Sequence, residues 1–138
     1  MKLHDWRKNG LISVWTYEPD ERNYPGWHIG ADASGYESLR EILLILSQSP
    51  IGSKRTIELD LSAKRYAAIG IRKNLAQKIV LLSASQEDQW VFRDASGKFV
   101  LKVSAIGVSA LLESISRAQG GEYDFCIKSA NGQRLWFW

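Results

Sequence analysis

The hydrophobic pattern at the start of the chain predicts two strands separated by a long connection. "LISVWTY" at 11–17 is rich in β-branched and aromatic residues, as strands are. The connection at 18–26 contains two prolines and a glycine, and "WHIGA" at 27–31 then predicts a second strand. Because side chains alternate along a strand, Trp27 takes the inward face and His28 the outward face, where no partner is predicted for it.

A helix is predicted over residues 35–48, because its leucines and isoleucines recur at helical spacing and form a wide apolar face. Ser34 followed three residues later by Glu37 matches a capping box, so Ser34 is expected to cap the helix. Asp32 adds a negative charge at the positive end of the helix dipole. Pro50 ends the helix, because proline cannot continue the hydrogen-bond ladder.

The rest of the chain predicts four strands, one further helix and a C-terminal hairpin. Residues 62–77 fit either a short helix or a loop, and the dipeptide Asn131-Gly132 marks a tight hairpin turn. The predicted elements are strands at 55–61, 78–84, 89–95 and 99–104, a helix at 105–119, and a hairpin of 122–129 with 133–138.

The order of elements indicates the fold class. Strand, strand, helix, strand, strand occurs twice, which predicts an α+β fold with a mostly antiparallel sheet and two main helices packed on it. The chain, residues 1–138, has the length of a single domain. A ββαββ pseudo-duplication is possible, although any two amphipathic ββα units share some positions. The matching pairs at one constant offset are Trp27 with Phe99, Ile29 with Leu101, Gly35 with Gly107, and Leu39 with Leu111.

Composition narrows the class of protein. The chain is 45% hydrophobic and 24% charged, which is typical of folded soluble domains. Its longest apolar run, 42–46, is far shorter than the roughly 18 residues of a membrane span, so no membrane partner is expected. The first residues lack a signal-peptide pattern. Cys126 is the only cysteine, which excludes an intramolecular disulfide and favours a cytoplasmic location.

The positive charge is concentrated in one segment. The net charge is +3, and residues 62–86 contain no Asp or Glu. This basic segment, 64–78, could bind single-stranded nucleic acid together with nearby aromatic side chains, or it could simply be a solvated face. No RNA-binding or helix-turn-helix motif accompanies it. Its cations are Lys64, Arg65, Arg72, Lys73 and Lys78.

Candidate chemistry is sparse. A small enzyme with a pocket at Trp27, His28 and Asp32 is one alternative, but a catalytic base needs a nucleophile or metal within hydrogen-bond distance, and none is predicted. No catalytic residue is therefore assigned. The chain has no HExxH motif, no paired cysteines and no glycine-rich nucleotide loop, so no metal or cofactor is expected.

Six tryptophans are more than one small core usually needs. In the last strand, Trp136 and Trp138 share a face, which is either covered by this chain or offered to a partner. Trp136 is expected to be the more buried of the two, since termini fray. The leading prediction is a small cytoplasmic non-enzymatic protein that binds a protein partner, as a homodimer, an inhibitor or an immunity-type protein. The candidate binding residues are Trp136, Trp138, Trp27, His28, Lys64, Arg65, Arg72 and Lys73.

Overall fold

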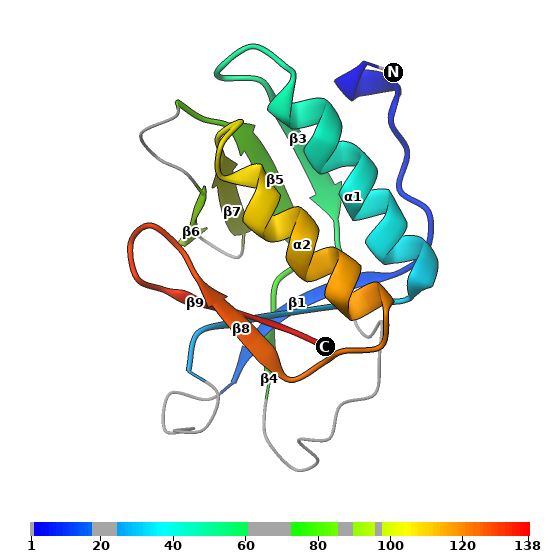
Figure 1. Ribbon diagram of the computed structural model, residues 1–138, viewed down its shortest axis with the longest axis vertical. Coiled ribbons are helices and arrows are strands. Elements are labelled where there is room, and N and C mark those ends of the chain that lie inside the picture. Colours follow the sequence, from blue (N-terminus) through cyan, green and yellow to red (C-terminus); the bar gives the residue numbers. More distant parts are fainter. Residues whose placement is uncertain (1, 18–24, 61–72, 86–89, 96–97) are drawn as a thin grey trace.

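A computed structural model describes residues 2–17, 25–60, 73–85, 90–95 and 98–138. Within these residues the chain forms two α-helices, one short 3-10 helix and nine strands (Figure 1). In chain order they are η1 (Leu3–Asp5), β1 (Ile12–Tyr17), β2 (Trp27–Ala31), α1 (Ala33–Ser47), β3 (Lys54–Glu58), β4 (Lys73–Leu75), β5 (Lys78–Ser83), β6 (Trp90–Ala95), β7 (Lys98–Val103), α2 (Val108–Gln119), β8 (Phe125–Lys128) and β9 (Arg134–Phe137).

The strands form two sheets. One is five-stranded in the order β4-β1-β2-β9-β8, and the other is four-stranded in the order β3-β5-β7-β6. Each sheet holds one parallel pair, β2 with β9 and β5 with β7, and the other pairs are antiparallel. The predicted α+β class, mostly antiparallel with two main helices, is confirmed. The single sheet of the prediction is in fact two, because local patterns identify strands but not their distant partners.

Each of the two sheets combines strands from both halves of the chain. In the first half, the β1–β2 hairpin leads into α1 and is followed by the antiparallel pair β3 and β5. In the second half, β6–β7 leads into α2 and is followed by β8–β9. The parallel pairs then join the first hairpin of each half to the second hairpin of the other half. The structure therefore shows the ββαββ pseudo-duplication as an intertwined topology, with β4 as an additional strand on β1.

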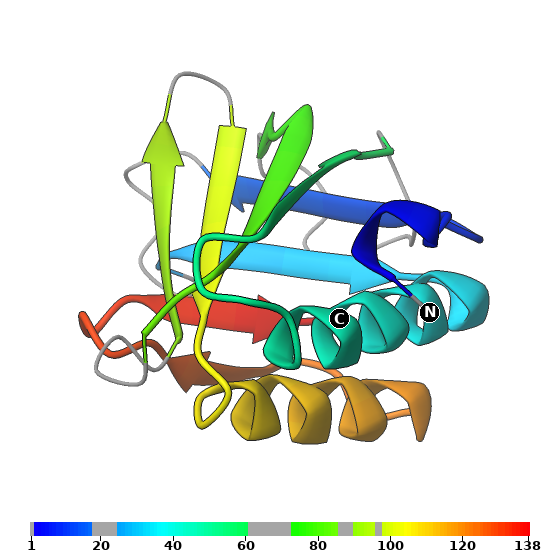
Figure 2. The same ribbon diagram turned by 90° about the horizontal axis from the view of Figure 1, so that it is seen from above.

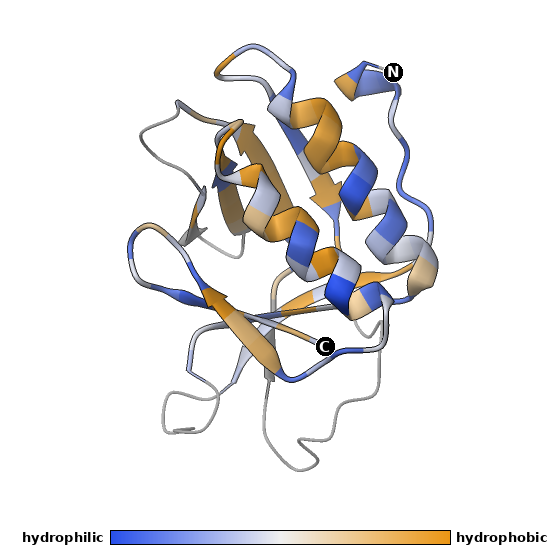
Figure 3. Ribbon diagram, viewed as in Figure 1, coloured by the Kyte–Doolittle hydropathy of each residue, from blue (hydrophilic) through white to orange (hydrophobic). Residues whose placement is uncertain are grey.

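The two helices lie side by side and run in opposite directions across the sheets, as both views show (Figures 1 and 2). Arg40 on α1 donates a hydrogen bond to Ser116 on α2 at 3.0 Å, and Gln119 donates one to Glu37 at 3.0 Å. Their apolar faces and the inward faces of both sheets enclose one main core (Figure 3). Gly35 allows the first turn of α1 to pack closely, since a Cβ there would lie 2.1 Å from the carbonyl oxygen of Leu11.

The N-terminus of α1 is capped by Asp32, and the predicted capping role of Ser34 is wrong. Asp32 accepts hydrogen bonds at Oδ1 from the amides of Gly35, at 2.7 Å, and Leu11, at 3.0 Å. Ser34 lies exposed in the first turn of the helix. The Asp32 carboxylate accepts from two amides, and its negative charge is stabilised by the positive end of the helix dipole. It is therefore a better cap than the hydroxyl of Ser34, two residues later.

The cap can be tested by two alanine substitutions. Asp32→Ala should lower the free energy of unfolding by about 1–2 kcal/mol, because two amides lose their acceptor. Ser34→Ala should change it by less than about 0.5 kcal/mol, as an exposed position without a structural role does. Urea unfolding followed by circular dichroism measures both. Equal losses in the two variants would contradict the assignment of Asp32 as the cap.

Candidate functional site

The predicted basic segment, 64–78, is described in part, from residue 73 onward. Lys64, Arg65 and Arg72 lie outside the described residues. Lys73 begins β4 and pairs through its backbone with Tyr17 in β1, while its side chain lies outside what the structure describes. Nucleic-acid binding through this segment therefore stays a prediction.

The side chains of Trp27, His28 and Asp32 do not converge. Trp27 packs on the helix side of its sheet against Phe99, with ring centroids 4.9 Å apart. His28 points to the opposite face, and Asp32 is occupied in capping α1. These three residues thus take up three separate environments, and no shared pocket for catalysis forms among them.

His28 is the centre of a second hydrophobic cluster, on the face of the five-stranded sheet that points away from the helices. We call this group the aromatic cluster, and its members are Trp15, Tyr17, His28, Trp136 and Trp138. The His28 ring stacks on Trp15 and Trp138 at centroid distances of 5.4 and 5.9 Å. Tyr17 meets His28 edge-on at 4.5 Å.

The outward, unpartnered position predicted for His28 is wrong, since its exposed fraction is 0%. The cause is strand pairing over a long sequence separation. In the sheet register His28 lies directly between Trp15 of β1 and Trp136 of β9. The alternation within β2 was interpreted correctly, but the face opposite Trp27 is a second core and not a solvent surface.

Trp138 is fixed in place by three hydrogen bonds. Its indole Nε1 donates to Nδ1 of His28 at 2.9 Å, and its backbone amide donates to Ile29 at 3.1 Å. The hydroxyl of Tyr36 donates to the backbone oxygen of Trp138 at 2.5 Å. Burial raises the pKa of Tyr36 well above its ordinary value, so this hydroxyl stays protonated as a donor.

The expected order of burial of the two C-terminal tryptophans is reversed. Trp138 is 5% exposed, whereas Trp136 is only partly buried and donates its indole N–H to the carbonyl of Pro25 at 2.9 Å. Fraying does not occur because the hydrogen bonds of Trp138 hold its backbone and its ring. Both rings lie in the aromatic cluster, which stiffens β9 from the far side of the sheet.

A surface that the sequence did not indicate is the outer edge of β8. This strand is the last of the five-stranded sheet, and among the described strands it pairs with β9 alone (Figure 1). Phe125, Cys126 and Ile127 are each partly exposed, and Tyr123 just before the strand is 69% exposed. The hairpin itself was predicted, but its position at an edge depends on the pairing of β9 with β2. We refer to residues 122–128 as the β8 edge.

The backbone groups of the β8 edge have a defined direction. The amide of Ser129 donates to the carbonyl of Gln133 at 2.8 Å, in continuation of the β8–β9 register. In an antiparallel pair, hydrogen-bonded residues alternate with residues whose backbone groups face the other way. Ile127 therefore bonds to β9, while the amide and carbonyl of Cys126 and Lys128 point outward. The β8 edge offers these groups to a further strand.

The edge at β3, which corresponds to β8 in the pseudo-duplication, is contacted by the N-terminal segment of the same chain. The Nζ of Lys8 donates to the carbonyl of Glu58 at 3.1 Å and to the carboxylate of Asp60 at 2.7 Å. The guanidinium of Arg55 donates to carbonyls of the same N-terminal segment. Partial burial raises the pKa of Asp60, but the hydrogen bonds from Lys8 and from the Ile12 amide outweigh it and leave that pKa lowered.

Among the residues that the structure covers, no three His, Cys, Asp or Glu side chains gather as a metal site would require. In that same part of the chain, neither helix has the length and apolar character needed to cross a bilayer. Comparisons of the chain with protein-family models, with curated proteins and with solved structures find no match.

Proposed function

We propose that this protein is a small cytoplasmic, non-enzymatic binding protein that acts through protein–protein contact, and that it docks its partner on the β8 edge. The supporting observation is the outward row of backbone groups on β8 beside three partly exposed apolar side chains. A strand from a partner can extend such a sheet, because its main chain completes the hydrogen bonds and its side chains provide selectivity. An uncovered edge of this kind otherwise favours aggregation.

The side chains of the β8 edge are already ordered before a partner arrives. The ring of Phe125 stacks on Phe137 with centroids 5.4 Å apart, and the guanidinium of Arg117 lies 3.9 Å from the centre of the same ring. Arg117 is held in turn by an ion pair with Glu122. Binding to a pre-ordered surface loses less conformational entropy, so more of the contact energy remains as affinity.

The aromatic cluster supports the same edge from the other face. Cys126 of β8 lies opposite Trp136 of β9, whose neighbour Trp138 is anchored to His28 and Tyr36. The β8–β9 hairpin is therefore packed against the main core on one side and the aromatic cluster on the other. In this proposal the two C-terminal tryptophans act by making the docking strand rigid, and of these two Trp136 is the one exposed enough to touch a partner.

Cys126→Pro tests the proposal, because it removes an outward amide without removing a hydrogen bond to β9. The tagged protein is incubated with nuclease-treated lysate, and its self-association is followed by sedimentation velocity. We expect the wild type to retain a protein or to self-associate, and Cys126→Pro to lose at least about tenfold in that affinity. Cys126→Ser, which keeps the amide, is the matched control and should behave like the wild type.

Circular dichroism must show that Cys126→Pro is folded, and Lys128→Pro, which removes the next outward amide, serves as the second variant. Binding that survives in a folded proline variant would contradict docking on the β8 edge. Retention that occurs only in lysate without nuclease treatment, with no self-association, would contradict a protein partner altogether.

A further inference from the structure

We infer that the strand which pairs with the β8 edge is β8 of a second copy of this chain, antiparallel to the first and centred on Cys126. The result is a two-fold dimer in which the five-stranded sheets of both copies become continuous. This inference rests on the proposed function, and it names the partner.

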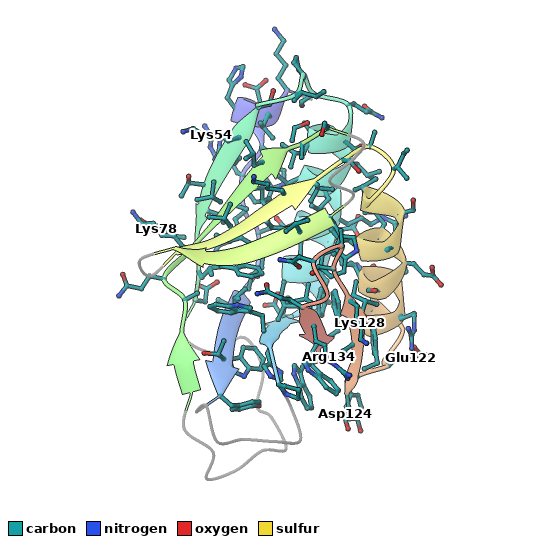
Figure 4. All side chains as sticks on the ribbon, turned by 90° about the vertical axis from the view of Figure 1, so that its left-hand side faces the viewer. Lys54, Lys78, Glu122, Asp124, Lys128 and Arg134 are labelled. Carbon is teal, nitrogen blue, oxygen red and sulfur yellow. The ribbon has the colours of Figure 1, made fainter. Side chains whose placement is uncertain are left out.

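The charges of the β8 edge are self-complementary in this arrangement. Asp124 directly precedes β8, with a φ of 63° and with its amide donating to the carbonyl of Phe137 at 3.0 Å. Antiparallel pairing about Cys126 brings its side chain near Lys128, at the far end of β8 in the other copy. Both side chains are exposed and lie at opposite ends of β8 (Figure 4). Opposite charges directly across two strands are favourable, and the two-fold axis repeats the pair. Parallel pairing in register would instead place Asp124 beside Asp124 and Lys128 beside Lys128.

The apolar side chains and the backbone agree with the same register. Phe125 of one copy falls opposite Ile127 of the other, which gives an aromatic and β-branched pair on the helix side of the sheet. The outward amide and carbonyl of Cys126 meet those of Cys126 in the second copy, as a hydrogen-bonded pair requires. If the register shifted by one residue, the outward amide and carbonyl of one copy would face backbone groups of the other copy that already bond to β9.

The corresponding strand β3 differs from β8 in one of its outward backbone groups. It carries the same kind of charge pattern, with Lys54 at one end and Glu58 at the other. However, the outward carbonyl of Glu58 already accepts a hydrogen bond from Lys8. A β8 edge that pairs with the β8 edge of a second copy gives a closed two-fold pair, because the same surface is used on both sides.

The size of the interface sets its strength. A strand of four residues buries less area than the roughly 1,200–2,000 Å² of a standard interface, so we expect dissociation constants on the order of micromolar. Self-association should therefore depend on concentration in the range that sedimentation and light scattering cover.

The test is a charge exchange between two variants. Lys128→Asp places an acidic residue at both positions 124 and 128, and Asp124→Lys places a basic residue at both, so each variant brings like charges together in its own dimer. Each should weaken self-association by roughly tenfold or more. An equimolar mixture of the two should recover it, because every acidic residue then faces a basic one. Lys54→Asp is the matched control, since it makes the same charge change on the β3 edge and should leave self-association unchanged.

A cross-link tests the register. Cys126 is the only cysteine, and a hydrogen-bonded antiparallel pair brings the two Cα atoms to about 5.5 Å. A short bis-maleimide should therefore link the wild type into dimers much faster than it links Lys128→Asp. Equal rates for the two proteins would overturn the register.

The outcomes separate this inference from the proposed function. A wild type that stays monomeric at high concentration overturns the second copy as partner, and a lysate protein whose capture is lost in Cys126→Pro would then leave the proposed function standing. Dimers that respond equally to Lys128→Asp and Lys54→Asp overturn pairing through the β8 edge. Absence of both self-association and proline-sensitive capture overturns both proposals.

Discussion

Trp138→Ala is expected to lower the free energy of unfolding by about 3–5 kcal/mol, the range for removal of a buried tryptophan. The indole is almost fully buried in the aromatic cluster, and its loss leaves a cavity beside Trp15 and His28. It also removes the hydrogen bond to His28 Nδ1. Domains have total stabilities of about 5–15 kcal/mol, so this variant should unfold at a markedly lower urea concentration.

Trp136→Ala is the matched comparison, because the same residue type on the same face is only partly buried. It should cost about 1–2 kcal/mol, in proportion to the smaller area removed from contact. Trp138→Phe keeps a ring while it removes the N–H, and it should cost less than the alanine variant. A larger loss for Trp136→Ala than for Trp138→Ala would contradict the observed order of burial.

His28→Ala is expected to cost about 3 kcal/mol, since it combines a cavity with the loss of the acceptor for the indole N–H of Trp138. His4 is the only other histidine, and its side chain is 77% exposed. His4→Ala should therefore change the stability by less than about 0.5 kcal/mol. Thermal and urea unfolding of both variants measure the difference.

A double-mutant cycle between His28 and Trp138 isolates their contact. The two residues share a hydrogen bond and a stacked ring pair, so their losses should not add, with a coupling of about 1 kcal/mol or more. If His28→Ala were as stable as the wild type, this result would contradict the structural role assigned to His28 in the aromatic cluster.

Features that depend on neighbouring residues could be predicted from the sequence. The apolar spacing of α1 and α2 and the alternation in β3 identified these elements, and Asn131-Gly132 located the β8–β9 turn. The fold class followed from their order. The helix start was misplaced, because Ser34 and Asp32 both match capping preferences and only the approach of Leu11 favours the aspartate.

Features that depend on distant pairing could not be predicted. His28 and Trp138 are 110 positions apart in the sequence, and they meet because β2 and β9 pair in parallel. The same pairing makes β8 an edge, and the pairing of β5 with β7 separates the second sheet from the first. A periodic pattern indicates which face of a strand is apolar, but not which of several other strands completes the sheet.

The pairing of strands between the two halves has a consequence for how the chain folds. Neither half contains a complete sheet, so a chain that has formed only β1 to β5, as during synthesis, has no partner for β2 or β5 along their parallel sides. The contacts that complete both sheets join residues far apart, which raises the relative contact order and slows folding. Because each half completes the sheet of the other, both should form and melt in one cooperative step, and the fold should resist division into smaller independent units.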